Sequence, residues 1–156
     1  KAYRITGHRI GAVITSEKRL VEIEKFLDTV SICPNQLGQK AALWGMQNLS
    51  KWLSKEREEI LSRKKAIIDN FIILKEKGWE LMGVGAYFAY VRHPFLIDSD
   101  QLCKKLVDDV SVLTLPGTMF VPKEDQSGKR QIRIAFANID AKKIKTLFNR
   151  LATLTE

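Results

Sequence analysis

The chain has 156 residues, of which 45% are hydrophobic and 28% charged, and its formal net charge is +8. These fractions are typical of a globular protein and argue against a disordered one. No apolar run approaches the ~18 residues of a membrane span, and the first residues lack the apolar core of a signal peptide. The two cysteines, Cys33 and Cys103, provide neither a disulfide framework nor metal-ligand spacing. We therefore expect no metal, no membrane partner and a cytoplasmic location.

The N-terminal part of the sequence predicts a strand followed by two helices. The segment RIGAVIT, residues 9–15, is apolar and β-branched, which favours a short buried strand. Ser16 begins a predicted helix that ends near Val30, because its apolar residues recur at helical spacing. After Pro34, Asn35 is expected to cap a second helix. The small residues of that helix allow another part of the backbone to approach closely.

The middle and C-terminal parts of the sequence differ in pattern. No proline or glycine occurs between Ser50 and Lys77, which predicts one long helix that joins two bodies. After Gly78, a candidate helix C-cap, the pattern becomes α+β. Asp98 and Asp140 precede predicted helices. We expect strands in four segments: WELMGV, AYFAYVRH, VLTLPGTMFV and RQIRIAFAN. The third of these is interrupted by Pro116 and Gly117.

Arg133 is the candidate binding residue of the C-terminal part. Alternation along QIRIAFAN places Ile132, Ile134 and Phe136 on one face of the strand and Arg133 on the other, beside two alanines. The planar guanidinium can bind a carboxylate through two parallel hydrogen bonds. The alternative interpretation is an arginine that pairs with a nearby aspartate or glutamate.

The chain opens with KAYRITGHRIG, which places Lys1, Gly7, Arg9 and Gly11 within eleven residues. The two glycines permit close approach of a ligand, so Arg9 is a candidate phosphate ligand; the alternative is a solvated turn arginine. Lys1 is either a surface lysine or a catalytic amine, and the catalytic role requires a lowered pKa.

The positive charge leaves a second class of function open. A basic α/β module that binds nucleic acid or another protein would explain the net charge and would expose aromatic side chains for stacking. Against it, cations and anions are interleaved, as in SKEREEILSRKK. In addition, Phe88, Phe120 and Phe136 lie in apolar strand contexts, so we expect them in the core. We therefore predict no nucleic-acid partner.

Together these motifs resemble the C-terminal part of a class I/II aminotransferase, the fold-type-I family of pyridoxal-phosphate enzymes. That family has the pattern K-x5-G-x-R-x-G, which Lys1, Gly7, Arg9 and Gly11 match. The segments GAYFAYV, VLTLPGTMF and QIRIAFAN resemble the small-domain strands of the family in the same order. The resemblance covers essentially the whole chain.

The resemblance implies roles for individual residues. Lys1 would bind pyridoxal 5′-phosphate covalently and move the proton during catalysis, and Arg9 would bind the cofactor phosphate. Arg133 would bind the α-carboxylate of the substrate, which favours transamination over the decarboxylase or lyase reactions of the same fold. Pro116 and Gly117 would shape the wall near the substrate. The implied substrates are an amino acid and a 2-oxo acid, and the implied assembly is a homodimer in amino-acid metabolism.

The resemblance also implies an α/β fold class and a domain organisation. Residues 1–49 would be the C-terminal end of the large cofactor-binding domain, residues 50–77 the connecting helix, and residues 78–156 a small α+β domain. In the family more than half of the chain precedes the cofactor lysine, and that half carries the other cofactor ligands. We therefore expect this chain to be a fragment that is inactive without its N-terminal half.

Overall fold

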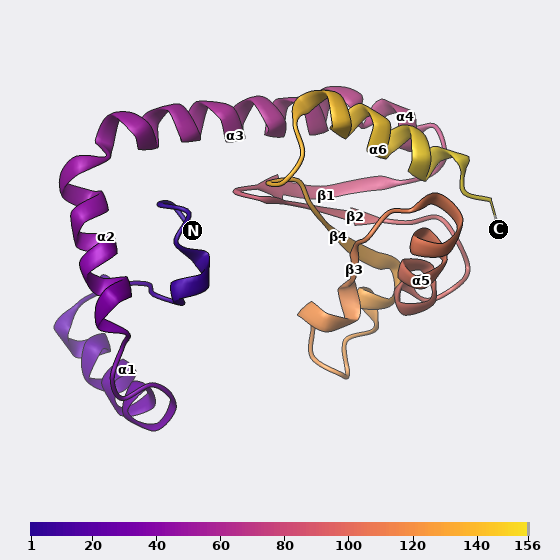
Figure 1. Ribbon diagram of the computed structural model, residues 1–156. Coiled ribbons are helices and arrows are strands. Elements are labelled where there is room, and N and C mark those ends of the chain that lie inside the picture. Colours follow the sequence, from indigo (N-terminus) through magenta and orange to yellow (C-terminus); the bar gives the residue numbers. More distant parts are fainter. Residues whose placement is uncertain (156) are drawn as a thin grey trace. The chain divides into compact units, whose positions relative to one another are not determined.

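The computed structural model describes residues 1–155, and these form two compact units, of which the first is Lys1–Arg57 and the second begins at Glu58 (Figure 1). No helix among residues 1–155 is both long enough and apolar enough to cross a bilayer.

The first unit is helical. It contains the short 3-10 helix η1 (Thr6–His8), α1 (Glu17–Val30), α2 (Gln36–Asn48) and the beginning of α3 (Ser50–Asn70). The two helices expected from the sequence are confirmed, and the Asn35 side chain caps α2 by accepting a hydrogen bond from Gly38 N at 3.1 Å. Asparagine suits this position because its side-chain oxygen replaces a missing helical acceptor.

The predicted strand over residues 9–15 is wrong. These residues form no strand and are mostly exposed; the Ile14 side chain is 96% exposed. A strand needs a neighbour to complete its hydrogen bonds. No strand of the described part of the chain pairs with this segment. The segment has the apolar, β-branched composition of a strand, but composition alone does not supply a partner strand.

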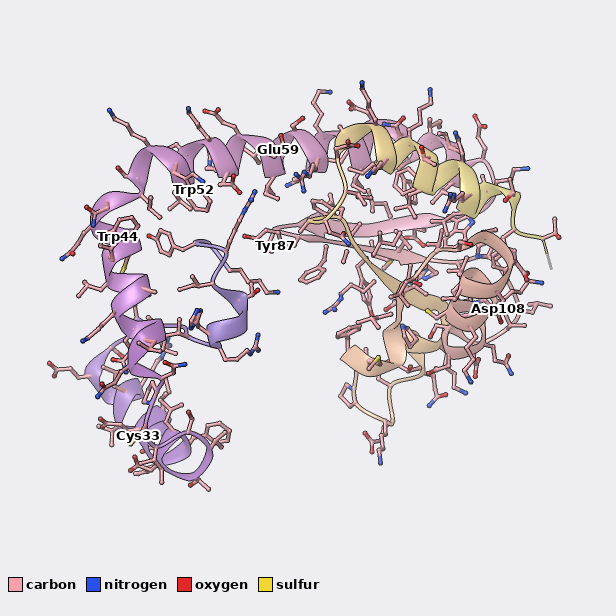
Figure 2. All side chains as sticks on the ribbon, viewed as in Figure 1. Cys33, Trp44, Trp52, Glu59, Tyr87 and Asp108 are labelled. Carbon is pink, nitrogen blue, oxygen red and sulfur yellow. The ribbon has the colours of Figure 1, made fainter. Side chains whose placement is uncertain are left out.

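The apolar side of α1 is not covered by the described residues. No residue of α1 is buried, and Phe26 and Val30 are 66% and 62% exposed. On α2, the side chain of Trp44 projects from the helix and is 58% exposed (Figure 2). The first unit therefore has little apolar core of its own.

Two glycines of α2 bring the chain's first residues against this helix. A Cβ atom on Gly38 would lie 3.2 Å from the Ile10 Cβ, and one on Gly45 would lie 2.9 Å from the Tyr3 ring. Both glycines are buried. The sequence-based expectation that small residues allow close approach of another segment is confirmed, and that segment is the one containing Lys1 and Arg9.

The long helix predicted between Ser50 and Lys77 is interrupted once. Regular α3 ends at Asn70, and α4 (Ile72–Lys75) follows after Phe71. The Phe71 N–H bonds Ile68 O at 3.4 Å, a 3-10 spacing, and its ring packs edge-on against Phe148 with centroids 5.9 Å apart. The sequence contains no proline or glycine here, so local composition does not predict the interruption.

Gly78 ends α4 as predicted. Its φ is +82°, and Trp79 N donates to Leu74 O at 3.1 Å while Gly78 N donates to Lys75 O at 3.0 Å. This pair of bonds is a Schellman motif, which favours glycine because its left-handed residue carries no Cβ.

The second unit is a four-stranded antiparallel sheet with helices. Its strands are β1 (Glu80–Gly85), β2 (Phe88–Arg92), β3 (Leu115–Pro116) and β4 (Gln131–Ala135), in the order β1-β2-β4-β3. The helices α5 (Ser99–Val110) and α6 (Ala141–Thr153) complete it, and Figure 1 shows α4 and α6 on the same side of the sheet. The prediction of an α+β pattern after Gly78 is confirmed.

The core of this unit lies on the helix-covered face of the sheet. Alternate strand residues, among them Ala89, Val91, Ile132 and Ile134, are buried there with apolar side chains of the helices. The α6 contribution, Ile144, Phe148 and Leu151, is fully buried and recurs at helical spacing. Residues between these strand positions point to the opposite face.

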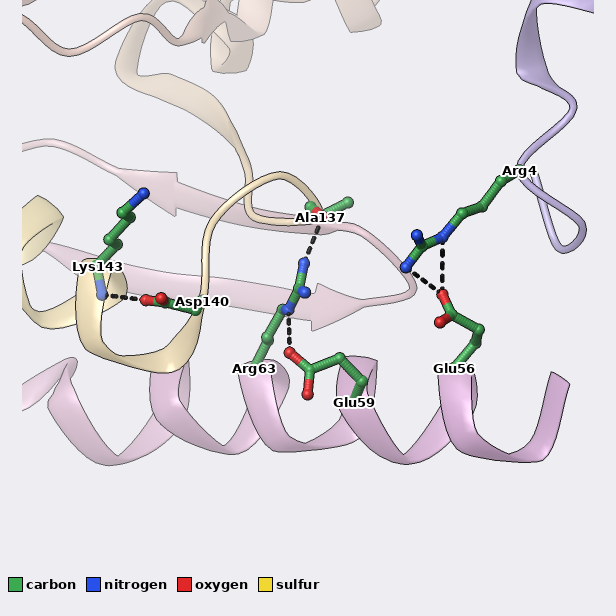
Figure 3. A network of polar contacts seen from close by, with 7 residues as sticks. All are labelled: Arg4, Glu56, Glu59, Arg63, Ala137, Asp140 and Lys143. Carbon is green, nitrogen blue, oxygen red and sulfur yellow. Dashed lines mark hydrogen bonds and ion pairs between the residues drawn. The ribbon is translucent and has the colours of Figure 1, made fainter. Parts of the chain in front are cut away.

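Polar contacts fix the ends of the elements. Asp140 caps α6 by accepting a hydrogen bond from Lys143 N at 2.8 Å, as predicted (Figure 3). Arg63 of α3 pairs with Glu59 at 2.8 Å and also donates to the carbonyl of Ala137, just after β4. The interior of α3 is thus tied to the segment that leads into α6.

The strand predicted over residues 112–121 is largely wrong. Only Leu115–Pro116 is a strand, and Gly117–Phe120 forms the 3-10 helix η2. A further 3-10 helix, η3 (Gln126–Arg130), lies beside η2. The predicted interruption at Pro116 and Gly117 is confirmed. A Cβ on Gly117 would lie 2.6 Å from Gly128 O, so glycine is needed where η2 and η3 approach each other.

His93 is buried at the end of β2 and should make stability depend on pH. Its ring stacks on Phe95 and meets Trp79 edge-on, and its Nε2 lies 3.3 Å from Lys129 O. Burial lowers the pKa of the imidazole below its ordinary value of 6.5; the Lys129 hydrogen bond opposes this shift and the charge of Arg130 adds to it. The folded state therefore binds fewer protons than the unfolded state below about pH 6.5.

We expect the free energy of unfolding to be maximal above that pH and to fall on acidification by up to about 1.4 kcal/mol per pH unit from this residue. Urea unfolding at pH 7.5 and pH 5.5 measures the effect, and a His93→Gln variant serves as the control. An equal fall in the variant would show that other groups cause the acid sensitivity.

Candidate functional site

Arg133 lies at the centre of β4, on the face of the sheet opposite the core. Its guanidinium carbon is 4.2 Å from the Phe88 ring centroid and 4.2 Å from the Phe120 ring centroid. These distances are within the range of cation–π attraction, so the two rings hold the guanidinium between them. Phe120 belongs to η2 and is 42% exposed, while Phe88 is half-buried. The expectation that these two rings lie in the core is wrong; of the three phenylalanines expected there, Phe136 alone is fully buried.

No acidic residue pairs with Arg133 among residues 1–155, and its Nε is buried without a hydrogen-bond partner. The alternative interpretation, a strand arginine neutralised by a local aspartate or glutamate, is therefore not realised in the structure. A half-buried cation without a counter-ion is suited to an external anion, because binding relieves its unsatisfied charge.

Tyr90 is the direct partner of Arg133 on the neighbouring strand. Directly paired residues of antiparallel strands share a face of the sheet, so both side chains project from the face opposite the core. The Tyr90 ring meets Phe120 edge-on at 6.4 Å, and its hydroxyl is buried without a hydrogen-bond partner. Burial raises the pKa of Tyr90, the negative charge of Asp125 adds to the shift, and Arg133 opposes it.

The first unit places Lys1 and Arg9 on its N-terminal segment. Lys1 is exposed, and its carbonyl accepts a hydrogen bond from Arg4 N at 3.0 Å. Arg9 adopts a left-handed conformation with φ of +50° and contacts Thr6 O at 3.4 Å through its guanidinium. No acidic side chain of the described residues pairs with Arg9, so its charge is available to an anion.

Arg4 anchors this segment to α3. Its guanidinium lies 2.6 Å from Glu56 at the closest atoms (Figure 3). It also lies 5.8 Å from the centroid of the Trp52 ring. Sequence reasoning did not single out Arg4, because nothing in the spacing connects it with a glutamate fifty-two residues later.

Sequence reasoning also missed Tyr90 and misassigned Phe88 and Phe120. A signal for the first two was present: Phe88 and Tyr90 alternate in AYFAYVRH, so they had to share one face of a strand. Lys1 and Arg9 belong to one unit and Arg133 to the other. Lys1 and Arg9 thus lie on one N-terminal segment of the first unit, whereas Arg133 lies between aromatic side chains of the second unit.

The family described as aminotransferase class I and II matches residues 1–151 of this chain. The chain belongs to that family. Membership confirms the family that the sequence motifs indicated. Nothing in the matches supports the alternative of a nucleic-acid-binding module.

Individual relatives agree with the family. The (5-formylfuran-3-yl)methyl phosphate transaminase of Methanocaldococcus jannaschii is 28% identical over 139 residues, which are 88% of this chain and 35% of that protein. An aspartate aminotransferase of Sulfurisphaera tokodaii is 25% identical over 150 residues, 88% of this chain and 34% of that protein. The aminotransferase chain described here thus spans about a third of the length of these curated relatives.

A solved structure shows the same arrangement of elements. A Methanococcus jannaschii protein, reported to resemble kynurenine aminotransferases in its active site, superposes with a TM-score of 0.71 and 28% identity. The match covers 97% of this chain and 39% of the other. The fold is therefore part of the fold-type-I aminotransferase fold, as predicted, and pyridoxal phosphate is the cofactor that the family implies.

Proposed function

We propose that the whole protein to which this chain corresponds is a pyridoxal-phosphate-dependent aminotransferase that moves an amino group between an amino acid and a 2-oxo acid. The observation that carries the proposal is Arg133. In a member of this family, a half-buried arginine stacked between two rings and lacking an acidic partner is suited to the α-carboxylate common to all amino acids.

Lys1 and Arg9 fit the cofactor chemically. Lys1 would provide the primary amine for the cofactor aldehyde, and Arg9, which no described acid neutralises, would provide a charge for the phosphate. Bound pyridoxal phosphate supplies the electron sink that makes the substrate α-carbon acidic. During the reaction the Lys1 amine would take the proton from that carbon, while Arg133 keeps the substrate oriented.

The proposed organisation follows the family. Residues 1–49 would end the large domain, residues 50–77 would connect the domains, and residues 78–156 would form the small domain. A homodimer in the cytoplasm and a role in amino-acid metabolism are parts of the same proposal. The 156-residue chain by itself is proposed to be inactive, because it spans only about a third of its relatives.

The test is an absorbance spectrum of the full-length protein with pyridoxal phosphate, before and after addition of an amino acid. We expect a band from the lysine-bound cofactor that is lost in a Lys1→Ala variant. Amino acid should convert this band to that of the pyridoxamine form.

A band that fails to convert, together with release of carbon dioxide, would indicate a decarboxylase instead. The absence of any band in a well-folded full-length protein would overturn the proposal. Transamination by the 156-residue chain alone would contradict the proposed inactivity of that chain.

A further inference from the structure

Two buried donors face the same surface of the sheet without a partner. The Tyr90 hydroxyl and the Arg133 Nε are both shielded from solvent, and neither has a hydrogen-bond partner among residues 1–155. A buried polar group without a partner costs about 1–3 kcal/mol, so most such groups in proteins are satisfied. Two of them on paired residues indicate a ligand that satisfies both.

The strand register brings these donors together. Tyr90 and Arg133 are direct partners between β2 and β4, and both side chains meet the ring of Phe120. On the other side of Arg133, its partner on β3 is Leu115, which has no polar side-chain atom. Tyr90 is thus the polar side chain that the two neighbouring strands place directly beside the arginine.

The electrostatics make the tyrosine a donor rather than an acceptor. Its hydroxyl remains protonated at neutral pH, because burial raises its pKa above the ordinary value of 10.0 and the negative charge of Asp125 acts in the same direction. The guanidinium is also only a donor. A protonated phenol beside a guanidinium therefore offers only hydrogen-bond donors, and a carboxylate can accept from them with both of its oxygens.

We propose that Tyr90 is a substrate-binding residue whose hydroxyl donates a hydrogen bond to the carboxylate that Arg133 binds. The inference rests on the proposed function, because it takes the carboxylate to be that of the amino-acid substrate. Phe88 and Phe120 leave the guanidinium little freedom. Tyr90 then selects which orientation of the carboxylate plane is bound.

The test is a Tyr90→Phe substitution in the full-length protein, with L-alanine, L-glutamate and L-phenylalanine as ligands. We expect each to bind about tenfold or more weakly, because a hydrogen bond to a charged group is lost. The factor should be the same for all three, since they share the carboxylate. Reaction of the cofactor with ethylamine, which has no carboxylate, should be unchanged.

A second readout separates binding from a structural role. Removal of an unsatisfied buried hydroxyl should leave the urea stability of the ligand-free protein unchanged or slightly higher. A double-mutant cycle that combines Tyr90→Phe with Arg133→Lys should show non-additive effects on amino-acid binding, because both side chains would hold the same carboxylate.

The outcomes distinguish this inference from the function on which it rests. Unchanged amino-acid affinity in Tyr90→Phe, with a loss in Arg133→Lys, would overturn the role of Tyr90 and leave the aminotransferase proposal standing. Unchanged affinity in both variants would remove the assignment of Arg133 as well. A loss of stability in Tyr90→Phe with an equal loss of ethylamine reactivity would identify a structural residue only.

Discussion

Replacement of Arg133 by alanine in the full-length protein is expected to weaken amino-acid binding by roughly 2–5 kcal/mol, or about 30-fold to several-thousand-fold. The substrate carboxylate would then be desolvated beside Phe88 and Phe120 without a counter-ion. Pyridoxal phosphate should still bind, because the proposed cofactor residues, Lys1 and Arg9, are unchanged. Titration with an amino acid, followed by cofactor absorbance, measures the loss.

The control for this prediction is the stability of the variant. Arg133 has no ion pair to lose among the described residues, so we expect its removal to change the free energy of unfolding by only about 1 kcal/mol, the size of the two ring contacts. Unchanged amino-acid affinity in a folded variant would contradict the assignment of Arg133.

A Gly128→Ala substitution is expected to destabilise the second unit by about 3 kcal/mol. The added Cβ would lie 2.7 Å from the Val121 side chain and 2.8 Å from the carbonyl carbon of Gly117. Backbone cannot move aside as the end of a side chain can. Gly128 O also accepts the Ser99 hydroxyl at 2.9 Å, so a shift here would disturb α5. Urea unfolding of the chain measures the change.

A matched control is Gly85→Ala, because a Cβ on Gly85 would meet no atom within 4 Å. The same chemical change should there alter stability only slightly. Equal stabilities of the two variants would show that η2 and η3 are more loosely packed against each other than the structure indicates.

The contact between η2 and η3 also holds η2, which carries Phe120. The Gly128→Ala substitution should therefore weaken carboxylate binding as well.

Much of the helical structure could be predicted from local patterns. Asn35 and Asp140 cap helices because their side chains suit that position, and Gly78 ends a helix because it has no Cβ. The buried face of α6 follows from the spacing of its apolar residues. These features depend on neighbours a few residues away, which a sequence displays directly.

The sequence-based predictions differ from the structure where contacts between distant segments determine the local conformation. The segment 9–15 has the composition of a strand and no partner strand among the described residues. The helix is interrupted at Phe71, whose ring packs against Phe148 far along the chain. Phe120 was expected in a strand core but lies in a 3-10 helix against Arg133. Packing partners far along the chain are not visible in local composition.

The candidate site was predictable in part. Alternation along β4 placed Arg133 on the face opposite the core, and this holds in the structure. Its aromatic neighbours and its pairing with Tyr90 required the register between β2 and β4. A register is a relation between two strands, so neither sequence segment contains it alone.

The stacking of Arg133 also has an entropic consequence. A free arginine side chain loses about 2 kcal/mol of rotamer entropy when a ligand fixes it. Here Phe88 and Phe120 restrict the guanidinium as the chain folds, before any ligand is present. The entropy loss is therefore part of the folding free energy and does not reduce the binding free energy. An incoming carboxylate meets a preorganised guanidinium, whose hydrogen bonds contribute fully to affinity.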